Sequence, residues 1–519
     1  MNYFFVLRQL ARLLAALSLA LLAVAAWSAL LAFGFGDTAE RAAAAAFAIS
    51  GAGGLAAGAI ASRLLRRGRT DLERREALLL VTLSWLVGAG LSGLPYLLWA
   101  SFAGADLGTG AAAFASPVNC YFEAMSGLTT TGATILTGID ELPRSVLLWR
   151  ATTHWIGGLG IVVLFVAVLP SVGVAGKRLF TVEAAGPSPR GVRPEVRETA
   201  RVLLIIYSAL TLALIGMLLA LGMGLFDAIC HAFATLATGG FATSDASIAG
   251  RSAAIQWILV LFMIAGGVNF GLYYKAVRRR SAGAIARDTE LRVYLVTIAL
   301  VALLCFGLLA GRPIITTAPD GAGALVTETG ALAALRHATF QAASIHTTTG
   351  FCTADFDLWP TLAKGALVLL MFIGGCAGST AGGIKVIRLW IALRLALAQI
   401  ERTFRPSVVR PLRVGGQVVS EEIKLDTLAY ILAFILLWLV GTGVLLAIEA
   451  PGDISFATAA TASVSALGTI GPGLGRVGAI QNYAWMTDAS KILLCGWMLM
   501  ARLEIFPVIV LLSLRFWRE

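Results

Sequence analysis

The sequence contains few charged residues. Asp, Glu, Lys and Arg make up 13% of its 519 residues, whereas soluble domains carry about 25%. Its four histidines and six cysteines are dispersed, with no HxxxH pattern, no His/Asp pair and no ligand-like cysteine spacing. These shortages argue against a soluble domain, a metal centre and a disulfide framework. They also argue against a membrane enzyme, which needs buried carboxylates, histidines or cysteines on one face.

Long apolar runs dominate instead, and hydrophobic residues make up 58% of the chain. A bilayer crossing takes about 20 apolar residues. Ten candidate spans stand out, at about 10–34, 42–62, 77–101, 146–170, 201–225, 252–274, 291–311, 361–400 (interrupted), 425–448 and 485–514. The first run follows Arg8 and Arg12, as in a signal peptide, but it continues to Gly34, so we favour a retained helix. We therefore predict an all-α polytopic membrane protein that forms one integral unit.

The net charge of +11 is distributed unevenly over the segments between these spans. When the N-terminus is placed inside and the ten spans alternate, most Lys and Arg residues fall in the inner segments, and the outer segments carry an excess of acids. This is the positive-inside bias of membrane proteins. It predicts cytoplasmic N- and C-termini, and it explains the basic charge without nucleic acid as a partner.

One short polar string recurs four times. The copies are "FEAMSGLTTTGATI" (122–135), "CHAFATLATGGFAT" (230–243), "FQAASIHTTTGFCT" (340–353) and the weaker "TASVSALGTIGPGL" (461–474). Their alignment superposes Gly132, Gly240, Gly350 and Gly471, at intervals of about 110 to 120 residues. The chain is thus predicted to contain four units of similar length.

Each string follows a helix-like segment that is too short to cross a bilayer, at about 115–129, 227–237, 329–346 and 454–467. All four lie on the outer side, between an outgoing and a returning span. A short helix that enters and returns as an extended strand is a re-entrant pore loop, which is tolerated in a membrane where it lines a water-filled path. Ion filters use rings of backbone carbonyls, which glycine allows to approach an axis. The alternative is a set of small-residue helix-packing motifs.

The span 361–400 is interrupted by "GGCAGSTAGGIK" (374–385), and it is the only returning span that looks broken. Five glycines disfavour helix there, so the segment is either a gate below the third filter or a close helix crossing. Arg502 lies deep in the last span, where a charge is costly and usually functional. It either faces the conduction path, or it pairs with Glu504 or extends to the inner surface.

At these residues the chain resembles the Trk/Ktr/HKT superfamily of potassium transporters, and within it the TrkH/TrkG-type membrane subunits of bacteria. The resemblance covers essentially the whole chain. It rests on "SGLTTTGAT", "ATGGF", "TTTGF", "GPGLG", "HWIGGLGI" (154–161), "GGCAGSTAGGIKVIR" (374–388) and "ARLEIFPV" (501–508). It implies four M1–pore loop–M2 repeats around a pseudo-fourfold pore, after two additional N-terminal helices.

The resemblance also implies the functional residues. Filter carbonyls are expected from Thr130, Thr131, Gly132, Thr238, Gly239, Gly240, Thr348, Thr349, Gly350, Thr469, Ile470 and Gly471. Phe351 and Cys352 are expected to pack the third string from behind. The expected gate consists of Gly374, Gly375, Gly378, Ser379, Thr380, Gly382, Gly383, Lys385 and Arg502. All four strings carry glycine where sodium-preferring members often carry serine, although Ile470 and Pro472 make the fourth string irregular.

Partners follow from the same resemblance. We expect K⁺ as the transported ion, no organic cofactor, a lipid bilayer, a homodimer, and a cytosolic nucleotide-binding RCK (TrkA-like) subunit that docks on the basic inner loops. The expected units are a two-helix segment (1–70), pore repeats 1 (71–175), 2 (176–285) and 3 (286–415, with the gating loop 374–385), and pore repeat 4 (416–519). The hypothesis is K⁺ uptake across the bacterial inner membrane. The alternative is an ion-coupled secondary carrier (K⁺/H⁺ or K⁺/Na⁺ symport) that works by alternating access.

Overall fold

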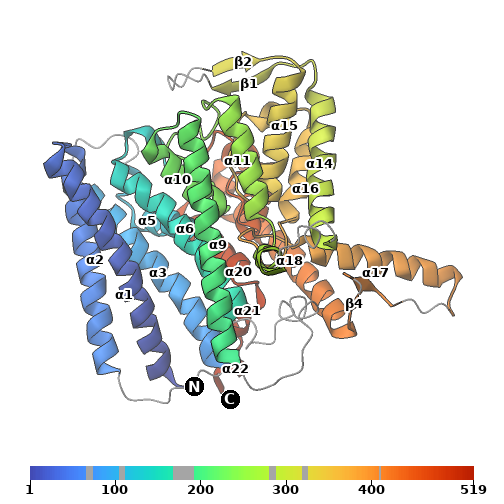
Figure 1. The fold of residues 1–519 in the computed structure, drawn as a ribbon, viewed down its shortest axis with the longest axis horizontal. Helices are drawn as coiled ribbons and strands as arrows, with labels where there is room; N and C mark the ends of the chain where they lie inside the picture. The colour runs from blue at the N-terminus through green and yellow to red at the C-terminus, as the bar shows by residue number, and fades with distance from the viewer. Residues whose placement is uncertain are drawn as a thin grey trace.

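A computed structural model describes residues 1–65, 74–104, 112–167, 192–279, 288–317, 325–407, 411–415 and 417–518. The described chain is almost entirely helical (Figure 1). Two N-terminal helices, α1 (Tyr3–Ala29, continued by a π-helix at Leu30–Gly34) and α2 (Ala39–Leu64), form a hairpin at one edge of the molecule. Both termini lie on one side of the molecule.

Four repeats follow the hairpin, and each consists of a long helix, a short helix, one of the four Thr/Gly strings and a second helix. We call the short helices pore helices and the strings filter strands, after the roles expected from the sequence. The first holds α3 (Arg74–Ala103), α5 (Pro117–Leu128) and α6 (Arg144–Ala167). The second holds α9 (Val192–Ala220), α10 (Leu225–Leu236), α11 (Ala253–Gly266) and α12 (Phe270–Arg279). The third holds α14 (Thr289–Leu309), α15 (Ala331–His346), α16 (Thr361–Phe372) and α17 (Val386–Phe404). The fourth holds α18 (Glu421–Ile448), α19 (Phe456–Gly468), α20 (Asp488–Arg502) and α21 (Phe506–Leu512), and α22 (Leu514–Arg518) ends the described chain.

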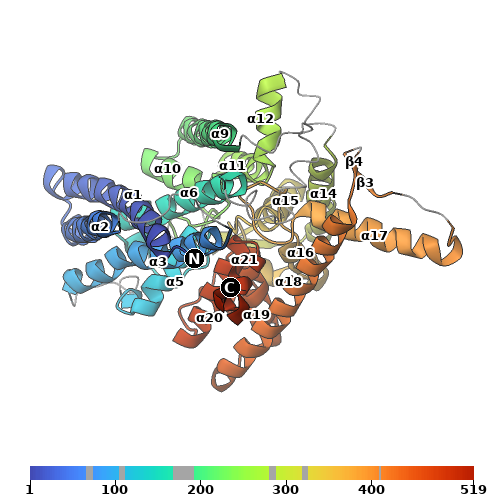
Figure 2. The ribbon, with the colours of Figure 1, turned by 90° about the horizontal axis from the view of Figure 1, so that it is seen from below.

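The repeats are arranged around a common centre, as the view from below shows (Figure 2). Among the described residues, six helices are long and apolar enough to cross a membrane, and α11 with α12 makes a seventh if the bent pair counts as one span. Polar caps begin several of these helices: Asp288 accepts a hydrogen bond from the Leu291 amide, and Ser420 accepts one from Ile423. The four-repeat membrane fold with two additional helices is as expected.

The expectation of a single broken returning span is wrong. α11 and α12 meet at an angle of 89° beside Gly267, and α20 ends at Arg502 before α21 begins at Phe506. Only α6 in the first repeat runs unbroken through its described length. Both of these breaks contact the loop between α16 and α17: the Cys376 amide donates to Gly267 O, and Arg502 donates to Thr380 O.

Two short hairpins and one projecting helix complete the described chain. Strands β1 (Ile314–Thr317) and β2 (Leu325–Glu328) pair antiparallel on the side opposite the termini, and β3 (Arg413–Val414) pairs with β4 (Gln417–Val418). Helix α17 projects away from the bundle in both views. The expected boundaries between units fall at or beside residues 66–73, 168–191, 280–287 and 416, outside the described residues.

Candidate functional site

The four pore helices end in the same unusual way. After each helix comes a threonine with a left-handed backbone, and the φ angles of these threonines are +55° (Thr130), +54° (Thr238), +56° (Thr348) and +52° (Thr469). A β-branched residue is a genuine outlier in this region. Strain of this kind is retained only where the surrounding structure enforces it, and it gathers at functional sites.

Hydrogen bonds from each strand to its pore helix fix the direction of the threonine carbonyls. The amides of Thr131, Gly239, Thr349 and Ile470 donate to the carbonyls of Ser126, Ala234, Ser344 and Ser465 at 2.8–3.0 Å. In a trans peptide the N–H and the preceding C=O point in opposite directions. The carbonyls of the four left-handed threonines therefore point away from their pore helices.

The glycine that follows two residues later packs against the neighbouring strand. A Cβ on Gly132 would lie 2.0 Å from the Gly239 carbonyl oxygen. A Cβ on Gly240 would lie 1.9 Å from Thr349 O, and one on Gly350 would lie 1.9 Å from Ile470 O. A Cβ on Gly471 would lie 2.8 Å from Thr131 O, so the fourth strand packs against the first. The four strands thus form a closed ring in the order of the repeats, and their glycines leave no room for a side chain.

The ring contains buried carbonyl groups without donors. The four left-handed threonines are fully buried, and no described residue donates a hydrogen bond to their carbonyls or to those of the residues that follow them. Unpaired buried carbonyls are rare and call for an explanation. Rings of such oxygens can replace the hydration shell of a cation.

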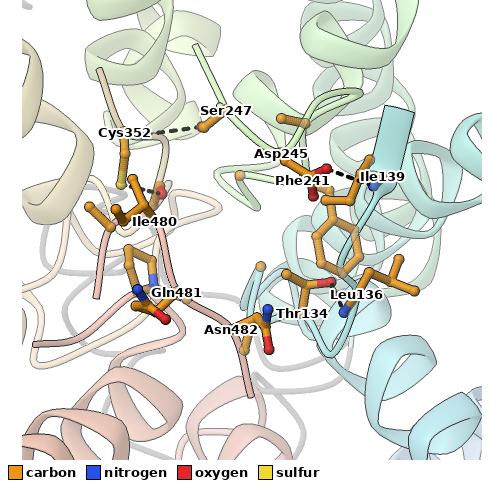
Figure 3. A pocket seen from close by; sticks show the side chains of 18 of the residues that line it. Thr134, Leu136, Ile139, Phe241, Asp245, Ser247, Cys352, Ile480, Gln481 and Asn482 are labelled. Atoms are coloured by element: carbon orange, nitrogen blue, oxygen red, sulfur yellow. Dashed lines mark hydrogen bonds between the residues drawn. The ribbon is translucent and has the colours of Figure 1, made fainter. Parts of the chain in front are cut away.

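A cavity of about 350 Å³ is lined by all four glycines and by no residue of the loop 374–385. Figure 3 shows Asp245, Gln481 and Asn482 around it. The Asp245 carboxylate accepts a hydrogen bond from the Ile139 amide at 3.0 Å. Partial burial raises the pKa of Asp245 above its usual range, although that hydrogen bond opposes the shift. Cys352 lines this cavity, whereas Phe351 is fully buried beside His231.

A buried ion pair supports the first strand from behind. Arg150 Nε donates to Glu123 Oε1 at 2.9 Å, and both side chains are almost fully buried. The carboxylate also accepts from Thr134 Oγ1 and from the Ile135 amide. The Arg150 guanidinium in turn donates to the Ala242 carbonyl at 3.2 Å, so it joins the first strand to the second. Sequence reasoning missed this pair, whose signal was one acid and one arginine in otherwise uncharged segments.

The loop 374–385 lies against the end of the ring that the left-handed threonines form. Its Gly382 amide donates to Thr348 Oγ1 at 2.8 Å, and Thr238 Oγ1 lies 3.3 Å from Thr380 Oγ1. A Cβ on Gly382 would lie 2.1 Å from Thr469 Oγ1. The loop therefore reaches three of the four left-handed threonines. Among the described residues, the hydroxyls of Thr130 and Thr469 have no hydrogen-bond partner.

The loop is closed on itself and tied to its surroundings. Its ends pair through Gly374 N and Ile384 O at 2.9 Å. Thr380 Oγ1 donates to Leu236 O and to Gly266 O, and the Cys376 amide donates to Gly267 O. Gly375 also packs against Gly267, at the break in the second repeat.

Further hydrogen bonds lie within the loop. The Ser379 hydroxyl donates to Cys376 O, and the Lys385 ammonium donates to Ala381 O. Left-handed backbone at Gly378 and Gly383 forms the turns.

Arg502 holds this loop from the fourth repeat. Its two terminal nitrogens donate to Thr380 O at 2.9 Å and to Gly157 O at 2.7 Å. The side chain is 3% exposed, so it does not extend to the inner surface. Pairing with Glu504 is also wrong, because the Glu504 carboxylate lies 2.6 Å from Arg388 Nη1. Every residue of the expected filter and gate is therefore within one connected site.

The chain is similar to known cation transport proteins over most of its length. Residues 67–517 match the model of the family described as "TrkH: Cation transport protein". The chain is 38% identical to the Trk system potassium uptake protein TrkH of Halomonas elongata, over 88% of each chain. It is 36% identical to the protein of the same name from Escherichia coli K12, again over 88% of each. The crystal structure of the potassium transporter TrkH from Vibrio parahaemolyticus superposes over 100% of both chains, with a TM-score of 0.83 and 33% identity.

Proposed function

The chain belongs to the TrkH family of cation transport proteins, and from this premise we propose that it conducts K⁺ inward across a bacterial inner membrane. The observation that carries the proposal is the closed ring of four strands with unpaired carbonyls. The three named relatives are potassium uptake proteins or a potassium transporter, and this supports K⁺ as the transported ion. Carrying an ion down its gradient requires no catalytic chemistry and no organic cofactor.

The ion ligands in this proposal are backbone oxygens of the four strands. They come from Thr130, Thr131 and Gly132, from Thr238, Gly239 and Gly240, from Thr348, Thr349 and Gly350, and from Thr469 and Ile470, with Gly471 closing the ring. The number of carbonyl oxygens that coordinate an ion at each position, and the field strength of their dipoles, set the preference for K⁺. The partly negative ends of the four pore helices add to the attraction for a cation.

The loop 374–385 is the gate in this proposal. Its contacts with Thr238, Thr348 and Thr469 support this role, because a loop bound to these residues would obstruct an ion leaving the ring. Conduction requires the loop to leave, and Arg502 opposes that movement by holding the Thr380 carbonyl. A positive charge beside the exit also raises the energy of a cation there.

The inner surface carries the proposed partners. A cytosolic nucleotide-binding RCK (TrkA-like) subunit would dock on the basic segment 388–424 and release the gate. Helix α17 projects from the bundle. One of its faces exposes apolar side chains, and this supports a homodimer. The face is formed by Leu389, Leu393, Leu397, Ile400 and Phe404. The five units at 1–70, 71–175, 176–285, 286–415 and 416–519 remain part of the proposal.

One observation favours the alternative of an ion-coupled carrier. Broken helices at corresponding places are typical of alternating-access transporters, and three of the four returning helices are broken. The four strands, however, form a continuous ring at one level, which a rocking mechanism does not need.

Proteoliposomes separate the two functions. A channel-like subunit carries K⁺ down its gradient without H⁺ or Na⁺ movement, and addition of the cytosolic subunit changes the rate. A fixed stoichiometry of H⁺ or Na⁺ to K⁺ would establish the carrier instead.

A further inference from the structure

The carbonyl of Gly471 differs from the other filter carbonyls because it has two donors. Ser465 Oγ donates to it at 2.8 Å and Tyr483 Oη donates to it at 2.7 Å. Ser465 is fully buried and Tyr483 is 3% exposed. A carbonyl oxygen has two lone pairs, so these hydroxyls use the acceptor capacity that an ion would need.

The other three glycines have no such donors. Among the described residues, none donates to the carbonyls of Gly132 and Gly240, and the Gly350 carbonyl has only the weak Cys352 thiol at 3.6 Å. Ser344 occupies the position of Ser465 in the third repeat, but its hydroxyl donates to Phe351 O, one residue later. The fourth strand is therefore displaced by one peptide relative to the third at its outer end.

Local sequence explains the displacement. Pro472 follows Gly471, and its ring restricts the backbone of the residue before it. The φ angle of Gly471 is +100°, against +78° to +82° in the other three glycines. Tyr483 reaches the carbonyl because its ring packs on Phe122, with centroids 5.6 Å apart, and its amide donates to Thr134 O at 2.8 Å. These contacts fix Tyr483 at the seam between the fourth and first repeats.

We propose that Ser465 and Tyr483 withhold the Gly471 carbonyl from the outermost ion position, which is then formed by the carbonyls of Gly132, Gly240 and Gly350 alone. Tyr483 is a positioning residue: it acts on the ion through this carbonyl. A larger number of carbonyl ligands favours K⁺ over the smaller Na⁺ in the ligand-number account of filters. The two hydroxyls therefore lower the K⁺ preference at the outer end of the filter, given the proposed function.

The experiment measures the K⁺/Na⁺ flux ratio of purified protein in proteoliposomes, for Tyr483→Phe, Ser465→Ala and the double variant. We expect the ratio to rise about three- to tenfold, the effect of one ordinary hydrogen bond on an equilibrium. The matched controls are Tyr121→Phe, whose hydroxyl donates to Leu86 O, and Ser463→Ala, whose hydroxyl donates to Trp438 O. Both controls should keep the wild-type ratio.

A flux ratio does not depend on how much protein is folded, so a less stable variant still gives an answer, and either single variant suffices if the other does not fold. A ratio that stays the same or falls in these variants, with K⁺ flux in the wild type intact, overturns the inference and leaves the proposed function standing. A wild-type protein that carries neither ion overturns both.

Discussion

Replacement of Gly350 by alanine adds one methyl group at the tightest part of the ring. The new Cβ would lie 1.9 Å from the Ile470 carbonyl oxygen and 2.9 Å from Pro472 Cδ, so the strands must separate. The φ angle of +82° adds a cost of about 1–2 kcal/mol for any L-residue. Overpacking of a rigid site costs about 1–3 kcal/mol more. We therefore expect the variant to lose about 2–5 kcal/mol of unfolding free energy, or to widen the ring.

Geometry also ranks the four alanine variants. Gly132→Ala and Gly240→Ala meet carbonyl oxygens at 2.0 and 1.9 Å and should resemble Gly350→Ala. Gly471→Ala meets its nearest atom at 2.8 Å and should be the mildest. The control is Gly365→Ala in α16 of the third repeat, where a Cβ meets nothing within 4 Å. In a helix interior this control should be neutral or stabilising.

Two assays test the ranking: unfolding in mild detergent and K⁺ flux per reconstituted protein. Gly350→Ala should reduce K⁺ flux about tenfold or more, because the ring carbonyls lose their spacing, while Gly365→Ala keeps the wild-type flux. If Gly350→Ala matched Gly365→Ala in both assays, or if Gly471→Ala were the most damaging, the ring packing described above would be refuted.

Three further outcomes test the gate and the entrance. Arg502→Ala should raise basal K⁺ flux about tenfold, since a charged hydrogen bond to the Thr380 carbonyl is lost; Arg515→Ala is the control, and unchanged flux would reject the restraint. Glu504→Gln should lower the unfolding free energy by about 3 kcal/mol because it leaves the Arg388 charge buried without its partner; equal thermal stability would contradict this. Asp245→Asn should slow K⁺ entry at low ionic strength and not at high salt. Because the pKa of Asp245 is raised, external acidification should neutralise it at a higher pH than an ordinary aspartate and slow the wild type, but not this variant. Acid slowing of both proteins alike would exclude Asp245 as its cause.

The sequence predicted the four strands because their signal is local and repeated. Gly132, Gly240, Gly350 and Gly471 each follow a short apolar helix by three or four residues, and this spacing indicates both the pore helix and the turn after it. The loop 374–385 was equally visible, since its glycines cannot sustain a helix.

The other two breaks left weaker local signals, of which Pro507 in the first turn of α21 is one. Gly266 and Gly267 lie in an otherwise apolar run that reads as one helix. At the last break Ile505 has a φ of +61° although it is β-branched, and tertiary contacts such as the Glu504–Arg388 pair hold it. The partners of Arg502 were hidden for a related reason: Gly157 belongs to another repeat, and only the ring arrangement brings it within 2.7 Å.

In the proposed function, the ring of backbone carbonyls carries K⁺ down its gradient. The most direct measurement is the flux of K⁺ and of Na⁺ through the purified protein in proteoliposomes under an imposed gradient of each ion, with no H⁺ gradient. We predict K⁺ flux that exceeds Na⁺ flux in the wild type and is lost in Gly350→Ala but not in Gly365→Ala. Flux that requires an H⁺ or Na⁺ gradient, or that survives unchanged in Gly350→Ala, would contradict it.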